Sequence, residues 1–174
     1  MNQQIILSGS GGQGILFLTR FFAEAALEYG LAVLTSEVHG MAMRGGTVLS
    51  HVKVGSFSSP LVRYGHADVA MFMNAENVAV HEGFVRPEGC LYINSNRPGK
   101  GFSCDASRVA ATLNLPAAGN VALLGFAVAG GKLFCDEQGS RLVLSRISGP
   151  GRRQANLRVF MTGYQIGLEP AGAS

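Results

Sequence analysis

Charged side chains are scarce in this sequence. Asp, Glu, Lys and Arg make up 14% of its 174 residues, against roughly 25% in typical soluble domains. With 47% hydrophobic residues the chain can bury a sizeable core, and we expect residues 1–174 to form a single domain. So little charge favours burial of some surface against another subunit, although a compact α/β domain with a thick core would have the same composition. The net charge of +3 is too small to indicate a nucleic-acid partner.

Cysteine is also sparse, and its spacing excludes the usual metal patterns. Cys90, Cys104 and Cys135 form no Cys-x-x-Cys pair, so the sequence carries no signal for an iron–sulfur or zinc site. Buried, reduced thiols are the simpler interpretation, and they suit a cytoplasmic protein. The N-terminus lacks a basic segment and the chain lacks a run of about 20 apolar residues, so we expect neither a secretory signal nor a membrane span.

Acidic residues are absent from residues 138–168, where several arginines lie. These arginines could form an edge that faces an anion, or they could lie on solvated helix faces. The sequence leaves both interpretations open. The arginines are Arg141, Arg146, Arg152, Arg153 and Arg158.

A glycine-rich loop near the N-terminus is the strongest local signal. An apolar run from Ile5 to Leu7 breaks into glycines, and a long apolar-rich segment follows, which predicts a strand, a tight loop and a helix over residues 12–29. The spacing Gly-x-Gly-x-x-Gly is used where a backbone approaches a phosphate, and the helix that follows presents free N–H groups to an anion. The loop carries no catalytic side chain, which indicates binding or docking. Its candidate binding residues are Gly9, Gly11, Gly12, Gln13 and Gly14.

A second loop is expected at the same edge of the sheet. Residues 36–46 fit neither a helix nor a strand and follow a predicted strand at residues 31–35. Loops after the carboxyl ends of parallel strands bind ligands in such sheets, so we expect the two loops to lie side by side. Arg44, before Gly45 and Gly46, could reach an anionic group, or it could pair with Glu37.

The remaining pattern predicts an α/β fold, a three-layer sandwich around a mostly parallel, mixed sheet with a Rossmann-like start. The first 35 residues form a β-α-β unit with parallel strands. Residues 47–54 alternate between polar and apolar side chains, which indicates a half-exposed strand antiparallel to the first two. Further strands are expected at residues 69–73 and 90–94, with a turn at 86–89 and an exposed loop at 96–103. Helices are expected at residues 75–82, 106–113 (capped by Asp105), 120–129 and 152–166, and one more helical segment begins at residue 140.

One enzymatic interpretation follows from the glycine pattern alone. Glu37 lies roughly 20 residues beyond the loop, where a ribose-binding acid is expected in NAD- or FAD-binding proteins. The alternating third strand and the absence of a substrate domain weigh against a stand-alone dinucleotide enzyme. No Gly-x-Ser-x-Gly elbow and no P-loop lysine is present, so a serine hydrolase and a P-loop nucleotidase are excluded.

Several segments along the chain form an ordered set of motifs. They are Gly9 to Gly14, Glu37 to Thr47 with His-Gly-Met and Arg-Gly-Gly, Ser50-His51-Val52-Lys53, Ser59-Pro60, Gly65-His66-Ala67-Asp68, Pro87-Glu88-Gly89, Asn120 before Leu123-Leu124-Gly125, and Asn156 with Gly163. This set resembles the gamma subunit or domain of 2-oxoacid:ferredoxin oxidoreductases (pyruvate, ketoisovalerate or 2-oxoglutarate), and it is most similar to the beta subunit of indolepyruvate ferredoxin oxidoreductase. Two positions depart from that pattern: Met43 precedes Arg-Gly-Gly where a polar residue is usual, and Asn74 stands where relatives often carry an acid.

The resemblance implies a complex that oxidatively decarboxylates a 2-oxoacid with thiamine diphosphate, passes electrons through iron–sulfur clusters to ferredoxin and forms an acyl-CoA. It places thiamine and cluster sites on partner subunits and leaves this chain without a catalytic residue or a metal of its own. In some members this part contacts CoA, so the Gly9–Gly14 loop and Arg44 are expected to meet CoA phosphates or a partner chain. A purely structural interaction module is the remaining alternative.

Overall fold

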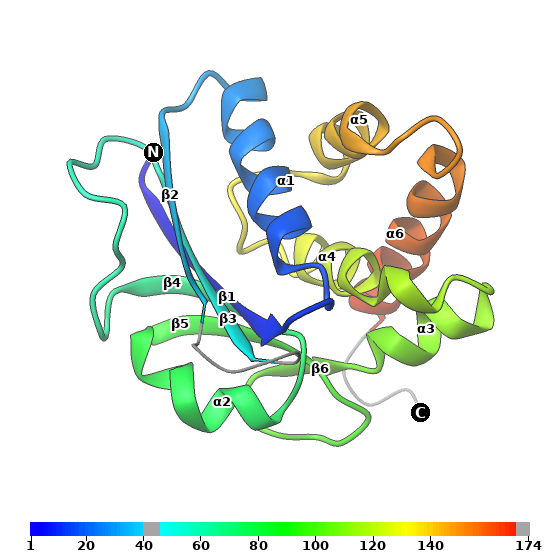
Figure 1. Ribbon diagram of the computed structural model, residues 1–174, viewed down its shortest axis with the longest axis horizontal. Helices are drawn as coiled ribbons and strands as arrows, with labels where there is room; N and C mark the ends of the chain where they lie inside the picture. The colour runs from blue at the N-terminus through cyan, green and yellow to red at the C-terminus, as the bar shows by residue number, and fades with distance from the viewer. Residues whose placement is uncertain (40–45, 170–174) are drawn as a thin grey trace.

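The computed structural model describes residues 1–39 and 46–169 of the chain. Within these residues the backbone forms a mixed sheet of six strands with helices on its faces (Figure 1). The strands are β1 (Gln3–Ser10), β2 (Val33–His39), β3 (Thr47–Val54), β4 (Ala67–Phe72), β5 (Val85–Asn94) and β6 (Phe102–Cys104). The helices are α1 (Ile15–Glu28), α2 (Glu76–His81), α3 (Ala106–Thr112), α4 (Gly119–Ala129), α5 (Glu137–Ile147) and α6 (Arg153–Leu168), with 3₁₀ turns η1 (Glu82–Phe84) and η2 (Pro116–Ala118).

The order of the strands is β2-β3-β1-β4-β5-β6. β3 runs antiparallel to both β1 and β2, whereas β1, β4, β5 and β6 pair in parallel. The predicted β-α-β unit is therefore corrected in one respect. β1 and β2 do point the same way, but β3 lies between them, so they share no hydrogen bonds. The predicted mixed sheet and the antiparallel third strand are confirmed.

Two local predictions around β3 are wrong. β2 continues through Glu37 to His39, into the segment that was expected to be a loop. β3 is buried along nearly its whole length instead of being half exposed. Its polar side chains have partners inside the fold: Ser50 accepts a hydrogen bond from the Thr19 hydroxyl at 2.8 Å, and Lys53 lies over the ring of Phe57. Alternation of polar and apolar residues thus indicates exposure only where the polar groups have no such partners.

The core is divided between the two faces of the sheet. On the face that α1, α4, α5 and α6 cover, the larger cluster includes Phe21, Phe22 and Phe160, all fully buried. On the opposite face, beneath α2 and η1, a smaller cluster includes Ile6 and Phe72. Figure 1 shows three layers: the helices α1, α4, α5 and α6, then the sheet, and then a thinner layer that contains α2. This matches the predicted three-layer architecture.

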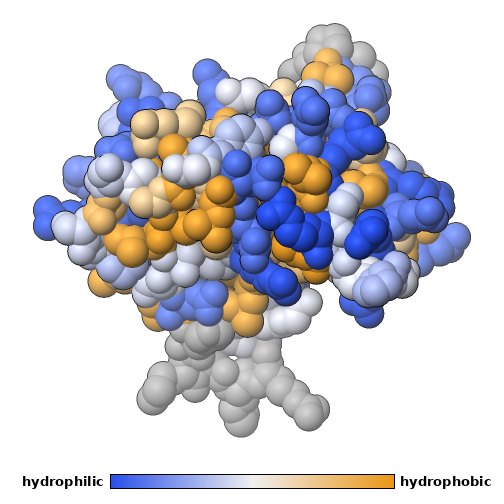
Figure 2. All heavy atoms as spheres, turned by 90° about the horizontal axis from the view of Figure 1, so that it is seen from above, coloured by the Kyte–Doolittle hydropathy of each residue, from blue (hydrophilic) through white to orange (hydrophobic). Residues whose placement is uncertain are grey.

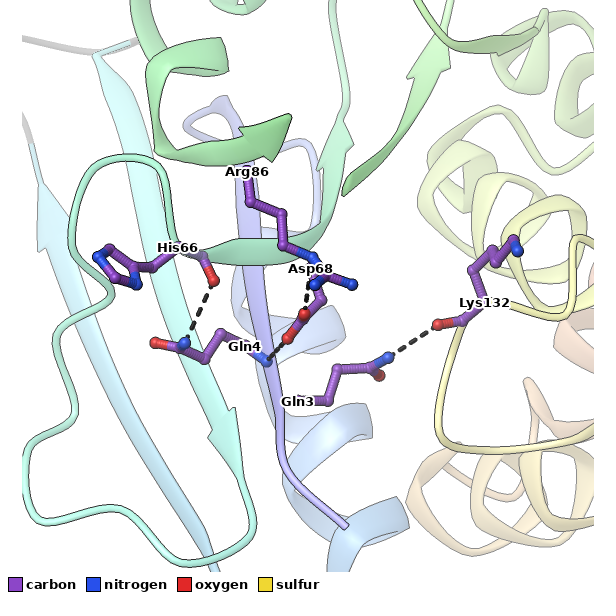
Figure 3. Close-up of polar contacts among 6 residues, drawn as sticks. All are labelled: Gln3, Gln4, His66, Asp68, Arg86 and Lys132. Atoms are coloured by element: carbon purple, nitrogen blue, oxygen red, sulfur yellow. Dashed lines mark hydrogen bonds and ion pairs between the residues drawn. The ribbon is translucent and has the colours of Figure 1, made fainter. Parts of the chain in front are cut away.

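Polar ties at the amino ends of the strands fix β1 in the sheet (Figure 3). The backbone N–H of Gln4 donates to the Asp68 carboxylate at 2.7 Å, and Arg86 pairs with the same carboxylate at 3.1 Å. The side-chain amide of Gln3 donates to the carbonyl of Lys132 at 2.8 Å, which ties β1 to the loop after α4. This edge lies away from the glycine loop, so these contacts serve stability.

The beginning of β5 was expected to be a turn. β5 instead starts at Val85, which pairs with Ala67, and the register then jumps so that Cys90 pairs with Val69. The residues between them bulge out of the ladder, a local geometry that Pro87 and Gly89 accommodate. The predicted loop at 96–103 ends instead in the short strand β6, whereas the predicted Asp105 cap of α3 is confirmed by the hydrogen bond that it accepts from the Arg108 N–H at 3.0 Å.

The scarcity of charge leaves apolar side chains on the surface. Leu16 and Leu27 on α1 and Leu142 on α5 are each more than half exposed. Figure 2 shows hydrophobic patches between hydrophilic ones on the upper face, where α1 and α5 lie. Burial of this surface against another subunit stays a prediction.

Candidate functional site

The glycine loop joins β1 to α1 at the carboxyl edge of the sheet. Gly12 and Gly14 have φ angles of +90° and +79°, which glycine adopts without steric cost. A Cβ at Gly14 would also collide with the side-chain amide of Asn120. No side chain caps α1, so the N–H groups of its first turn remain available to a ligand. The strand, loop and helix that the sequence predicted are therefore present, with the helix starting at Ile15.

Gln13 supports the loop from the inside. Its Oε1 atom accepts a hydrogen bond from the Ser10 N–H at 2.6 Å, and its Nε2 donates to the carbonyl of Met73 at 3.4 Å. Asn74 donates to the same Gln13 Oε1 at 3.3 Å and to the Ser10 hydroxyl at 3.2 Å. The predicted binding residue Gln13 thus uses its side chain to hold the loop against the segment that follows β4, and its backbone N–H donates within the loop to the Ser10 carbonyl at 3.1 Å.

The end of the second loop meets the glycine loop. The N–H of Gly11 donates to the carbonyl of Gly46 at 3.0 Å, so these two predicted site residues are neighbours. Arg44 and Gly45 lie outside the described residues. Glu37 is on β2, which β3 separates from β1. With neighbouring strands roughly 4.8 Å apart, Glu37 stands two strand spacings from β1, which does not reproduce the position of a ribose-binding acid after an adjacent strand.

A cleft with a volume of about 590 Å³ opens on the helical side of the glycine loop. That volume lies in the range of small-molecule sites. Its walls come from the loop, from α1, from η2 and the start of α4, and from the junction between α5 and α6. The lining residues are Gly12, Gly14, Phe17, Asn114, Leu115, Pro116, Ala117, Ala118, Asn120, Val121, Ile147, Ser148, Gly149, Arg152, Ala155 and Asn156.

The lining combines apolar surface with groups that attract anions. No acidic residue lines the cleft in the described part of the chain, and Arg152 is the one formally charged residue that does. Gly14, Ala118 and Arg152 are the N-cap positions of α1, α4 and α6, and none of these helices has a side-chain cap. The positive ends of three helix dipoles therefore add to the Arg152 charge around one cleft.

Asn120 joins the cleft to the glycine loop. It is 5% exposed, and its Nδ2 donates to the carbonyl of Gly14 at 3.2 Å. On the opposite wall Asn156 donates to the Ser148 hydroxyl at 2.9 Å. The sequence predicted neither residue as a binding residue, because an isolated asparagine carries no chemical signal of its own.

The arginine-rich segment divides into two groups. Arg141 pairs with Glu137 at 3.0 Å, and Arg146 pairs with Glu28 of α1, so both are held on the surface. Arg152 instead lines the cleft, and it makes no ion pair with the described residues. The solvated-surface interpretation therefore holds for Arg141 and Arg146, and an anion-facing role stays a prediction for Arg152, a residue that sequence reasoning did not single out.

A serine and a half-buried histidine contact each other outside the cleft. The Ser8 hydroxyl is 2.9 Å from His81 Nδ1 and accepts a hydrogen bond from Asn77 at 3.1 Å. Burial lowers the pKa of His81, which favours its neutral form. Ser8 is fully buried and cannot meet a substrate, so the pair serves as a packed polar contact.

Two further properties concern the described residues only. Residues 1–39 and 46–169 bring no three His, Cys, Asp or Glu side chains together in a way that could hold a metal ion. The helices in the same ranges lack the length and apolar character that a membrane span requires.

Comparison with known proteins decides the family. The model of the pyruvate ferredoxin/flavodoxin oxidoreductase family matches residues 4–166. The chain belongs to this family. The matched range includes the glycine loop and all six strands except the first residue of β1.

Related sequences and structures agree with that assignment. Indolepyruvate oxidoreductase subunit IorB of Archaeoglobus fulgidus is 36% identical over 97 residues, which cover 56% of this chain and 48% of that protein. The same subunit of Methanothermobacter thermautotrophicus is 38% identical over 71 residues, covering 41% of this chain and 36% of that protein. The match thus spans about half the length of these relatives or less.

Solved structures of ferredoxin oxidoreductases share the fold. The gamma subunit of a keto/oxoacid ferredoxin oxidoreductase from Geobacter sulfurreducens has a TM-score of 0.77 at 21% identity, over 95% of this chain and 98% of that one. The 2-oxoglutarate:ferredoxin oxidoreductase of Magnetococcus marinus, solved with 2-oxoglutarate, coenzyme A and succinyl-CoA bound, has a TM-score of 0.77 at 22% identity, over 95% of this chain and 31% of that one. At such identities the likeness establishes the α/β fold.

Proposed function

We propose that this chain is the gamma-type subunit of a thiamine-diphosphate-dependent 2-oxoacid:ferredoxin oxidoreductase. The complex oxidatively decarboxylates a 2-oxoacid to an acyl-CoA and passes the electrons to ferredoxin. In this proposal partner subunits hold thiamine diphosphate and the iron–sulfur clusters, and this chain docks onto them and contributes to the CoA site. Family membership and the likeness to the gamma-subunit structure from Geobacter sulfurreducens support the assignment to such a complex.

The cleft beside the glycine loop is the observation that carries the CoA part. CoA contains a nucleotide with a diphosphate, so its site needs N–H donors or cations together with an apolar wall for adenine. The glycine loop and the uncapped start of α1 supply donors, and Phe17, Leu115 and Val121 supply apolar lining. A related complex has been solved with CoA bound, which makes CoA the ligand of choice for this cleft.

Arg44 is proposed to assist from the second loop, because Gly46 at the end of that loop contacts Gly11. If Arg44 reaches a CoA phosphate, Arg44→Ala raises the KM for CoA in the assembled enzyme and leaves the KM for the 2-oxoacid unchanged. If the chain is purely an interaction module, the same substitution disturbs assembly and leaves the KM for CoA unchanged.

A stand-alone NAD- or FAD-binding oxidoreductase is not favoured, because β3 separates Glu37 from β1. Calorimetric titration of the purified chain with CoA, NAD and FAD tests the difference. We expect CoA to bind and NAD and FAD not to bind. Co-purification of the tagged chain from its host should also bring a thiamine-binding and a cluster-binding subunit, and tight NAD binding by a chain that purifies alone would refute the proposal.

A further inference from the structure

The cleft offers a cation in addition to the glycine loop, and CoA carries a second anionic centre in addition to its diphosphate. Arg152 is exposed, lines the cleft and makes no ion pair with the described residues. Its neighbour Arg153 is also exposed but does not line the cleft. Arg152 is therefore placed to meet a ligand, whereas Arg153 is a matched cation on the surface beside it.

The chemistry of the wall around Arg152 suits a phosphate monoester. A guanidinium group binds phosphate through two parallel N–H···O bonds, which gives both strength and geometric selection. Arg152 is also the N-cap residue of α6, a helix of 16 residues whose first turn has no side-chain cap. No carboxylate lines the cleft in the described part of the chain, so a dianion there would not be repelled by a negative side chain of the lining.

The diphosphate and this second anion have separate partners. The Gly12–Gly14 segment and the start of α1 form one wall, and the α5–α6 junction that carries Arg152 forms another. CoA differs from dephospho-CoA only in a 3′-phosphate on its ribose, which is separate from the diphosphate. With the diphosphate at the glycine loop, the 3′-phosphate is the remaining dianion for Arg152.

We infer that Arg152 binds the ribose 3′-phosphate of CoA and makes the cleft selective for CoA over dephospho-CoA. The inference rests on the proposed CoA function and goes beyond it, because it assigns a specificity-determining residue that lies in neither glycine loop. It also explains why one arginine of an arginine-rich segment faces the cleft while Arg141 and Arg146 are held by surface carboxylates.

Calorimetric titration of the full chain with CoA and with dephospho-CoA tests the inference, using wild type, Arg152→Ala and Arg153→Ala. We expect wild type and R153A to prefer CoA by about tenfold or more, the usual scale for a charged hydrogen-bonded contact. R152A should lose that preference because its affinity for CoA falls, while its affinity for dephospho-CoA stays within about twofold of wild type. Arg152→Lys keeps the charge but not the two-pronged geometry, and it should show an intermediate preference.

The outcomes separate the two proposals. A wild-type chain that binds CoA without preference, or an R152A variant that keeps the full preference, would overturn the role of Arg152 and leave the CoA function intact. A wild-type chain, free or within its complex, that binds neither CoA nor dephospho-CoA would overturn the CoA function itself. Because Arg152 is exposed and makes no ion pair with residues 1–39 or 46–169, R152A should melt at the wild-type temperature, and a large loss of affinity with an unchanged melting temperature supports direct contact.

Discussion

The contact between α4 and α6 offers the sharpest test of how this sequence stabilises its fold. α4 is a nearly uncharged helix buried between the sheet and α6, and Leu123 and Leu124 within it are fully buried. Glycines allow the two backbones to touch. A Cβ added at Gly163 of α6 would meet the carbonyl oxygen of Ala122 and would lie 2.9 Å from its carbonyl carbon, and a Cβ at Gly125 of α4 would meet the same atoms of Phe160.

Substitution of Gly163 by alanine should therefore be costly. Carbon atoms pack at roughly 3.5–4.0 Å, so the two backbones must separate by about 0.6 Å or more. The obstructing atoms are backbone, which cannot rotate away, and α4 cannot retreat because the sheet lies behind it. Overpacking of this kind costs about 3 kcal/mol, at the upper end of its usual range. Alanine regains about 1 kcal/mol through its higher helix propensity, so the expected net loss is about 2 kcal/mol.

Thermal and urea unfolding, followed by circular dichroism, measure this loss. For a domain of this size, 2 kcal/mol corresponds to a melting temperature lower by about 4–8 °C. Gly119→Ala is the matched control, since Gly119 also lies in α4 but its added Cβ would meet only ordinary contacts, the nearest at 3.5 Å. G119A should be neutral or slightly stabilising. If G163A and G125A unfold at the same temperature as G119A, the close approach of the helices does not contribute as argued.

Two further predictions concern stability. Two histidines have pKa values below the ordinary value of 6.5. Burial lowers the pKa of His51 most, followed by the charges of His81 and Lys53, and burial lowers the pKa of His81. Both histidines then bind protons more weakly in the folded than in the unfolded chain, so their stabilising contribution is complete above pH 6.5 and is lost as the pH falls through the lowered values. The melting temperature should therefore drop between about pH 7.5 and 5. His81→Asn should reduce that drop. If the variant has the same pH profile as wild type, the loss of stability does not come from His81. Asp68→Ala removes the acceptor of the Gln4 N–H and the partner of Arg86 and should cost about 1–2 kcal/mol in urea unfolding, whereas Glu88→Ala, at an exposed carboxylate, should change stability by less than about 0.5 kcal/mol.

Local chemistry made part of this fold predictable from the sequence. The spacing of Gly9, Gly11 and Gly14 predicted a strand, a loop and a helix. The structure supplies a reason at two of these positions: Gly14 has a positive φ angle and Asn120 beside it, and a Cβ at Gly9 would crowd the side chains of Gln13, Ile15 and Met73. The Asp105 cap and the buried helix over residues 120–129 were predicted correctly for similar reasons, since capping and an apolar surface on all sides are local properties.

The order of the strands could not be obtained in this way. β3 lies between β1 and β2 although it follows both in the sequence, a choice made by long-range packing. The burial of β3 could not be predicted either, because the partners of its polar side chains lie on other segments. Thr19 of α1 bonds to Ser50, and the N–H of Val62 bonds to His51. Arg152 was hidden among similar arginines, since only the tertiary structure shows which of them line the cleft.

The position of β3 also decides between the two ways of using a glycine loop. In a dinucleotide-binding half the acid after the second strand lies beside the loop, because the two strands are neighbours. Here β3 separates those strands, so Glu37 is moved away and the loop gains Gly46 as its neighbour on that side. The polar and cationic groups around the loop, Asn120 and Arg152, come instead from the later helices. If CoA binds here as proposed, its diphosphate meets the glycine loop and its ribose 3′-phosphate meets Arg152 on a separate wall, whereas NAD carries no phosphate besides its diphosphate.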